Sequence, residues 1–161
     1  MRQVFSDDTL WERLRAEAND VLSREPILAP LILTAVVNRH SFEEAVIHRI
    51  ASRLANTTVA ADLIADSFLA ALRADPGIGK AFRADIAAVV DRDPACTRLI
   101  EPLLYFKGFQ AIQTHRLAHW LYGKGRKDFA LYLQSRASAV FQCDINPAAS
   151  IGRGIFLDHA T

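Results

Sequence analysis

The sequence predicts a mainly α-helical protein in which a helical bundle is followed by a short segment of a different type. Two observations predict the bundle. Apolar residues recur every three or four positions through most of the 161-residue chain, and the connections between these stretches are short. A third observation sets the last segment apart: Ile145, Ile151 and Leu157 recur at a spacing of six, which is the period of neither a helix nor a strand.

Five helices are expected before the first clear break in the pattern. Pro26 ends the first helix, and a short, largely apolar helix follows it. Ser41 and Glu44 form a capping box at the head of the third helix. Thr57 or Thr58 is the expected start of the fourth. We place these helices at about residues 7–25, 27–38, 42–56, 58–74 and 78–90.

The run Asp91–Pro94 interrupts the helical pattern. Asp93 directly before Pro94 fits a helix N-cap followed by the proline that is favoured in the first turn. Two further helices, at about residues 102–124 and 128–141, complete the bundle.

Metal binding is not the expected role of the histidines or cysteines. His115 and His119 have an i, i+4 spacing that can bind a metal, but no acidic partner lies between them, so a packed or partly solvated helix face is the preferred interpretation. Cys96 and Cys143 are far apart and show no CxxC spacing, which argues against a zinc site and favours two reduced thiols in a cytosolic protein.

Composition excludes several classes of function. The net charge is +1, so no basic field is available to attract nucleic acid or a membrane surface. Apolar residues make up 51% and charged residues 23%, a balance typical of a globular domain. The run Ile27–Val37 is too short to span a bilayer, and the acidic N-terminus does not resemble a signal peptide. A cytoplasmic protein is expected.

The spacing of six in the last segment has two interpretations. It suits a hexapeptide solenoid, in which one aliphatic residue of each unit points inward, and Gly152 and Gly154 would suit its sharp corners. An ordinary loop followed by a strand is the alternative.

The same segment contains Asp158 and His159. Histidine is the default general base near neutral pH, and a neighbouring carboxylate, either Asp144 or Asp158, could fix its tautomer. The alternative is a surface histidine in a turn.

Several segments, in order, are similar to bacterial serine acetyltransferases. The segment Asp144-Ile-Asn-Pro-Ala-Ala, continuing as Ile151-Gly-Arg-Gly-Ile-Phe-Leu-Asp-His-Ala-Thr161, resembles the start of that family's left-handed parallel β-helix. Asp91-Arg-Asp-Pro-Ala95, Pro102–Phe109 and Gln113–Trp120 resemble it upstream. The resemblance implies an α-helical oligomerisation and substrate-side domain at residues 1–142. It also implies the beginning of a hexapeptide-repeat catalytic domain at residues 143–161, in a truncated chain.

The resemblance implies a serine O-acetyltransferase, which transfers acetyl from acetyl-CoA to the hydroxyl of L-serine and makes O-acetylserine for cysteine biosynthesis. His159 would be the catalytic base, oriented by Asp144, while Asp93 and Asp158 would bind the substrate. A capping role and a binding role for Asp93 can coexist, because a capping carboxylate has a second oxygen. No metal and no cofactor is implied beyond acetyl-CoA as co-substrate.

The resemblance also implies partners. They are a homo-oligomer arranged as a dimer of trimers, cysteine as a feedback inhibitor, and O-acetylserine sulfhydrylase bound through a C-terminal tail. A second active-site histidine and most of the acetyl-CoA site are expected in later solenoid turns, and the tail is expected beyond them, so we expect little or no activity from these 161 residues. Measurable serine acetylation by them would refute this expectation. The alternatives are a non-catalytic helical oligomerisation module and a hexapeptide acetyltransferase for another alcohol.

Overall fold

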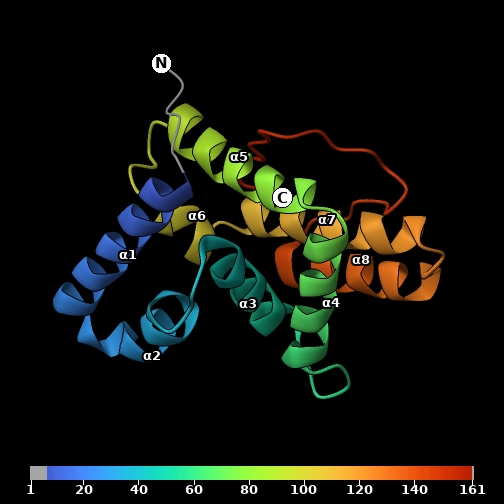
Figure 1. The fold of residues 1–161 in the computed structure, drawn as a ribbon, viewed down its shortest axis with the longest axis horizontal. Coiled ribbons are helices and arrows are strands. Elements are labelled where there is room, and N and C mark those ends of the chain that lie inside the picture. Colours follow the sequence, from blue (N-terminus) through green and yellow to red (C-terminus); the bar gives the residue numbers. More distant parts are fainter. Residues whose placement is uncertain (1–6, 161) are drawn as a thin grey trace.

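The structure is a computed structural model and describes residues 7–160 (Figure 1). These residues form helices joined by short connections and contain no strand, which confirms the mainly α-helical prediction. No helix among them is long and apolar enough to cross a membrane. The elements are α1 (Asp7–Arg24), η1 (Pro26–Leu28), α2 (Ala29–Ile32), η2 (Leu33–Val37), α3 (Phe42–Leu54), α4 (Ala61–Ala74), α5 (Gly77–Arg92), α6 (Ile100–Leu104), α7 (Lys107–Gly123) and α8 (Lys127–Phe141).

The capping box at the start of α3 is present with one change of partner. The Ser41 hydroxyl oxygen accepts a hydrogen bond from the Glu44 N–H at 3.1 Å, as predicted. The Glu44 carboxylate accepts from the N–H of His40 at 2.7 Å, one residue before the usual partner. Two backbone donors at the helix start therefore have partners.

The second predicted helix is not continuous. Residues 26–37 form a 3₁₀ turn, one α-helical turn and a π-helical stretch that ends with the Asn38 N–H donating to the Leu33 carbonyl at 2.9 Å. Pro26 and Pro30 lie in this region, and neither has an N–H to donate. An uninterrupted α-helical ladder therefore cannot run through it.

The fourth helix starts later than predicted. The Asn56 side-chain oxygen accepts hydrogen bonds from the N–H groups of Thr58 and Val59, both at 2.9 Å. This side-chain turn holds the backbone outside a helical conformation, and α4 begins only at Ala61.

The prediction of a helix capped by Asp93 is wrong. The Asp93 carboxylate does accept a hydrogen bond from a downstream N–H, that of Ala95, at 2.9 Å. The Asp93 carbonyl accepts from Cys96 at 3.1 Å and closes a turn, and the next helix begins only at Ile100. The carboxylate therefore stabilises a turn after α5, not the start of a helix.

Helix α7 lies at the centre of the molecule. It pairs with α8 and contacts α4, α5 and α6, and the C-terminal segment, shown in red in Figure 1, passes over it. Its buried face therefore extends to polar residues, which lose contact with water and need partners inside the protein. These residues are Gln110, Gln113, Thr114, His115 and Arg116.

Residues 142–160 follow α8 without regular secondary structure. The left-handed backbone of Gln142, with φ of 57°, turns the chain out of the helix. The three aliphatic residues with spacing six are only half-buried. A β-helix strand forms its backbone hydrogen bonds with the adjacent coils. The described segment has no adjacent coil, so the predicted beginning of a β-helix has no strand here.

Candidate functional site

Two histidines of α7 bind the C-terminal segment. The His115 Nε2 atom lies 2.9 Å from the Ala149 carbonyl oxygen, and the His119 Nδ1 atom lies 2.8 Å from that of Pro147. A carbonyl only accepts, so each of these ring nitrogens carries a proton. The i, i+4 histidine pair therefore forms hydrogen bonds with backbone carbonyl groups. Residues 7–160 contain no group of three or more His, Cys, Asp or Glu side chains that could bind a metal.

A buried polar cluster holds the next part of the segment. Asp85 of α5 is completely buried, and its Oδ1 atom accepts hydrogen bonds from the N–H groups of Gly154 and Ile155, both at 2.9 Å. Its Oδ2 atom accepts from Arg116 Nη2 at 2.7 Å and from Gln113 Nε2 at 2.8 Å. The segment is therefore attached to α5 and α7 by directional bonds.

Three of the four predicted site residues line one cavity of about 210 Å³. Asp93 comes from the turn after α5, and Asp158 and His159 come from the C-terminal segment. The start of α7 forms another wall, in which Lys107 Nζ donates a hydrogen bond to the Gln142 side chain at 2.7 Å. The other lining residues are Tyr105, Phe106, Gly108, Phe156 and Leu157.

The Asp93 carboxylate is available to a ligand through one oxygen. Oδ1 accepts from Ala95 and stabilises the turn. Within residues 7–160, Oδ2 has no hydrogen-bond partner. A turn-stabilising role and a binding role are therefore geometrically compatible.

Asp158 and His159 lie together at the mouth of this cavity, and both are exposed. His159 Nε2 lies 3.4 Å from Asp158 Oδ1. His159 and Ala160 both have left-handed backbone conformations, with φ of 52° and 47°, which non-glycine residues seldom adopt. A carboxylate is thus beside the imidazole.

Asp144 lies outside this cavity. Its Oδ1 atom accepts a hydrogen bond from Gln134 Nε2 of α8 at 2.7 Å, and it is not among the residues that line the cavity. The predicted role of Asp144 as the carboxylate that orients His159 stays a prediction.

The backbones of α7 and the C-terminal segment meet at Gly108. A Cβ atom at this position would overlap the Leu157 carbonyl oxygen, which is backbone and cannot rotate away. Only glycine allows this approach. The closeness of the two backbones is what brings Asp158 and His159 to the start of α7.

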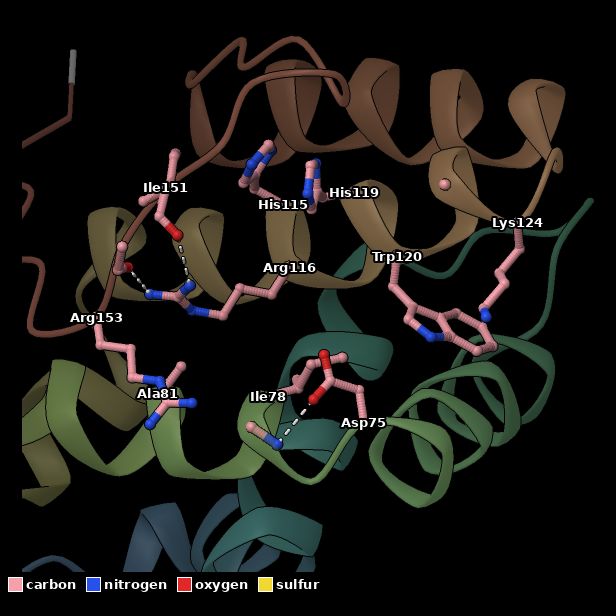
Figure 2. Close-up of a pocket in the computed structure, with 13 residues that line it drawn as sticks. Asp75, Ile78, Ala81, His115, Arg116, His119, Trp120, Lys124, Ile151 and Arg153 are labelled. Atoms are coloured by element: carbon pink, nitrogen blue, oxygen red, sulfur yellow. Dashed lines mark hydrogen bonds between the residues drawn. The ribbon is translucent and has the colours of Figure 1, made fainter.

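A second and larger cavity of about 510 Å³ is lined in part by residues 151–153. Figure 2 shows Trp120 and Lys124 on one side of it and Arg153 on the other. The Lys124 Nζ atom is 5.9 Å from the centroid of the Trp120 ring. None of the four predicted site residues lines this cavity. The smaller cavity is lined by Asp93, Asp158 and His159, the last of which is the predicted base, so we place the candidate site there.

The sequence interpretation missed Asp85, Gln113 and Arg116. Asp85 lies in the helix predicted at about residues 78–90, and Arg116 lies between His115 and His119, for which a metal site was considered. One signal was available: both occupy positions that the helical period assigns to a buried face. A buried charge requires a buried partner of opposite charge.

Burial alters the titration of nearby groups. Burial lowers the pKa of His115, although its bond to the Ala149 carbonyl acts the other way. Burial raises the pKa of the Cys96 thiol to about 11 and also raises that of Cys143. Both cysteines are free thiols, and we expect both to stay protonated and unreactive at neutral pH.

We expect the lowered pKa of His115 to make the fold acid-sensitive. The unfolded state takes up the proton first, so stability is complete above the ordinary histidine pKa of 6.5 and falls as pH drops below it. Burial also lowers the pKa of His48, which adds to this effect. Urea denaturation at pH 7.5 and 5.5 should show a smaller loss of stability for His115→Gln than for wild type. Equal losses would contradict the assignment.

The comparisons with known proteins agree with one another. The family model described as "Serine acetyltransferase, N-terminal" matches residues 10–114. Probable serine acetyltransferase 3 of Oryza sativa subsp. japonica is 46% identical over 157 residues, which is 97% of this chain and 52% of that protein. The chain spans about half the length of the curated relatives it matches.

Two solved structures are similar over nearly the whole chain. The serine acetyltransferase of Brucella abortus strain S19 in complex with coenzyme A is 54% identical, with a TM-score of 0.93, covering 94% of this chain and 61% of that one. The Neisseria gonorrhoeae serine acetyltransferase in complex with serine is 40% identical, with a TM-score of 0.93, covering 99% and 65%. The chain therefore belongs to the family of serine acetyltransferase N-terminal regions.

Proposed function

We propose that this chain is part of a serine O-acetyltransferase and contributes the serine-binding part of its active site. The observation that carries the proposal is that Asp93, Asp158 and His159 line one small cavity, although Asp93 is far from the other two in the sequence. The relatives solved with serine and with coenzyme A support the same substrates for this protein.

The roles proposed for these residues follow the family resemblance and fit the chemistry of acyl transfer. His159 takes the proton of the serine hydroxyl as the oxygen attacks the thioester carbonyl carbon of acetyl-CoA. The carbon–sulfur bond breaks, and the imidazolium returns the proton to the departing CoA thiolate. The free oxygen of Asp93 and the carboxylate of Asp158 bind the substrate ammonium group. Asp144 is proposed to orient His159 in the complete enzyme.

The proposed architecture has two parts. Residues 1–142 form the helical domain, and residues 143–161 are the first coil of a left-handed parallel β-helix. The spacing of Ile145, Ile151 and Leu157 supports this, because their half-buried side chains would be covered by the next coil. A dimer of trimers, cysteine as feedback inhibitor and O-acetylserine sulfhydrylase as partner belong to the same proposal.

The test is the loss of the base. In the protein of full natural length, His159→Asn should lower kcat for serine acetylation by about 10²–10⁴-fold, with little change in the KM for acetyl-CoA. The control is His40→Asn, since His40 is exposed and lies away from the cavity. Its kcat should stay at the wild-type value. Wild-type kcat in His159→Asn would refute the proposed role of His159, and no serine acetylation by the wild type would refute the function.

A further inference from the structure

The segment that carries the proposed base is attached to the helices just before it reaches the cavity. Gly154 and Ile155 immediately precede Phe156–His159, and both donate their N–H groups to one oxygen of Asp85. Ile155 is three residues from Asp158, so its backbone is within about 11 Å of that residue even in an extended chain. A displacement of the Ile155 backbone would therefore move the neighbouring Asp158 and His159.

The second oxygen of Asp85 is equally constrained. It accepts from Arg116 Nε at 3.0 Å, from Arg116 Nη2 at 2.7 Å and from Gln113 Nε2 at 2.8 Å. Asp85 has no exposed surface, and the Arg116 side chain is 8% exposed. Each oxygen thus has two or more donors, and the carboxylate has little freedom to rotate.

Arg116 donates hydrogen bonds to the same segment, whereas Asp85 accepts them. Its Nη2 atom donates to the Gly152 carbonyl at 2.8 Å, and Nη1 lies 3.4 Å from that of Ile151. Figure 2 shows these bonds crossing from α7 to the segment. Asp85 accepts from the N–H groups of residues 154 and 155, while Arg116 donates to the carbonyls of residues 151 and 152. The ion pair therefore fixes both the position and the direction of the backbone.

We infer that Asp85 is a positioning residue for the acetyl-transfer reaction, acting through the backbone of Gly154 and Ile155 to set where Asp158 and His159 lie. This inference rests on the proposed function. Apolar packing alone could bury the segment, but it is not directional. Hydrogen bonds from a buried ion pair select one register, and removing one partner leaves the other charge unpaired.

The variant Asp85→Asn tests this in two independent ways. This substitution nearly keeps the shape of the side chain and removes the charge of the carboxylate. It also replaces one acceptor oxygen with an NH₂ group, a donor that faces other donors. In this chain, hydrogen exchange at the amides of Gly154 and Ile155 should become about tenfold faster or more. In the protein of full natural length, kcat/KM for serine should fall by about 10²-fold, the size expected for a misplaced site, while the KM for acetyl-CoA stays within about twofold.

A control separates positioning from general stability. Gln110 is also completely buried, but its side chain hydrogen-bonds to the Leu103 carbonyl and to Arg53 and not to the segment. Gln110→Leu should lower the melting temperature without changing exchange at Gly154 and Ile155 or kcat/KM for serine. If Asp85→Asn does not fold, Arg116→Lys replaces it, because lysine keeps the charge but cannot bridge the carboxylate and both carbonyls. Arg116→Lys should also speed exchange at Gly154 and Ile155 and lower kcat/KM for serine, but by less than Asp85→Asn.

Each result decides the inference. Unchanged amide protection in Asp85→Asn, or an equal loss of kcat/KM in Gln110→Leu, would overturn it. If the wild type acetylates no serine, the proposed function fails, and with it the link from Asp85 to that reaction. The exchange measurement still decides separately whether Asp85 holds the segment.

Discussion

Replacing Gly108 by alanine should strongly weaken serine binding at the proposed site. The added Cβ atom would overlap the Leu157 carbonyl oxygen, and neither the helix nor the segment can yield without moving backbone. Overpacking of this kind costs about 1–3 kcal/mol of stability. It would also push Asp158 and His159 away from the start of α7. We expect a fall in serine affinity of about 10²-fold, measured by calorimetry.

Gly123 at the end of α7 provides the matched control. A Cβ atom there meets nothing within 4 Å, and alanine favours the helix more than glycine does. Gly123→Ala should therefore keep serine affinity and melt at the same or a higher temperature. Serine affinity within twofold of wild type in Gly108→Ala would show that the approach of the two backbones does not shape the site.

Removing the charge of Asp93 should weaken serine binding selectively. Asp93→Asn keeps a side-chain oxygen that can accept from Ala95, so the turn is retained. It loses the carboxylate that would bind the substrate ammonium, a charged hydrogen bond of about 1.5–3 kcal/mol. Serine affinity should fall by about 10–100-fold, and acetyl-CoA binding should stay at the wild-type value in the protein of full natural length.

The chain contains a second Asp-Pro turn that serves as a control for this variant. Asp75 precedes Pro76, and its Oδ1 atom accepts from the Gly77 N–H at 2.9 Å, the same local arrangement as at Asp93. Asp75 lines the larger cavity and not the proposed site. Asp75→Asn should leave serine affinity unchanged. Equal effects of the two variants on serine, or equal effects of Asp93→Asn on serine and acetyl-CoA, would argue against the binding role.

Sequence patterns predict the structure correctly where it depends on interactions between residues close in the sequence. The helical period predicts the bundle, and the Ser41–Glu44 pattern correctly marks the start of α3. Local patterns failed where side chains compete with the backbone. The Asn56 side chain accepts backbone hydrogen bonds, so α4 begins later than predicted. The Asp93 carboxylate stabilises a turn where a helix was predicted.

The candidate site was only partly predictable for a different reason. The family resemblance predicts four site residues, and three of them, Asp93, Asp158 and His159, line one cavity. The buried pair of Asp85 and Arg116 depends on contacts between residues 31 positions apart and on a segment further still along the chain. No local pattern encodes such contacts, because they arise only when α5, α7 and the C-terminal segment pack together.

Calorimetric titration of this chain with L-serine tests the central claim most directly, with L-cysteine and acetyl-CoA as companion ligands. If Asp93, Asp158 and His159 form a serine site, L-serine should bind with measurable heat, and Asp93→Asn should weaken that binding while Asp75→Asn does not. Absence of L-serine binding to the folded wild-type chain would contradict the claim. The cavity would then be a feature of helical packing, and serine recognition would lie elsewhere.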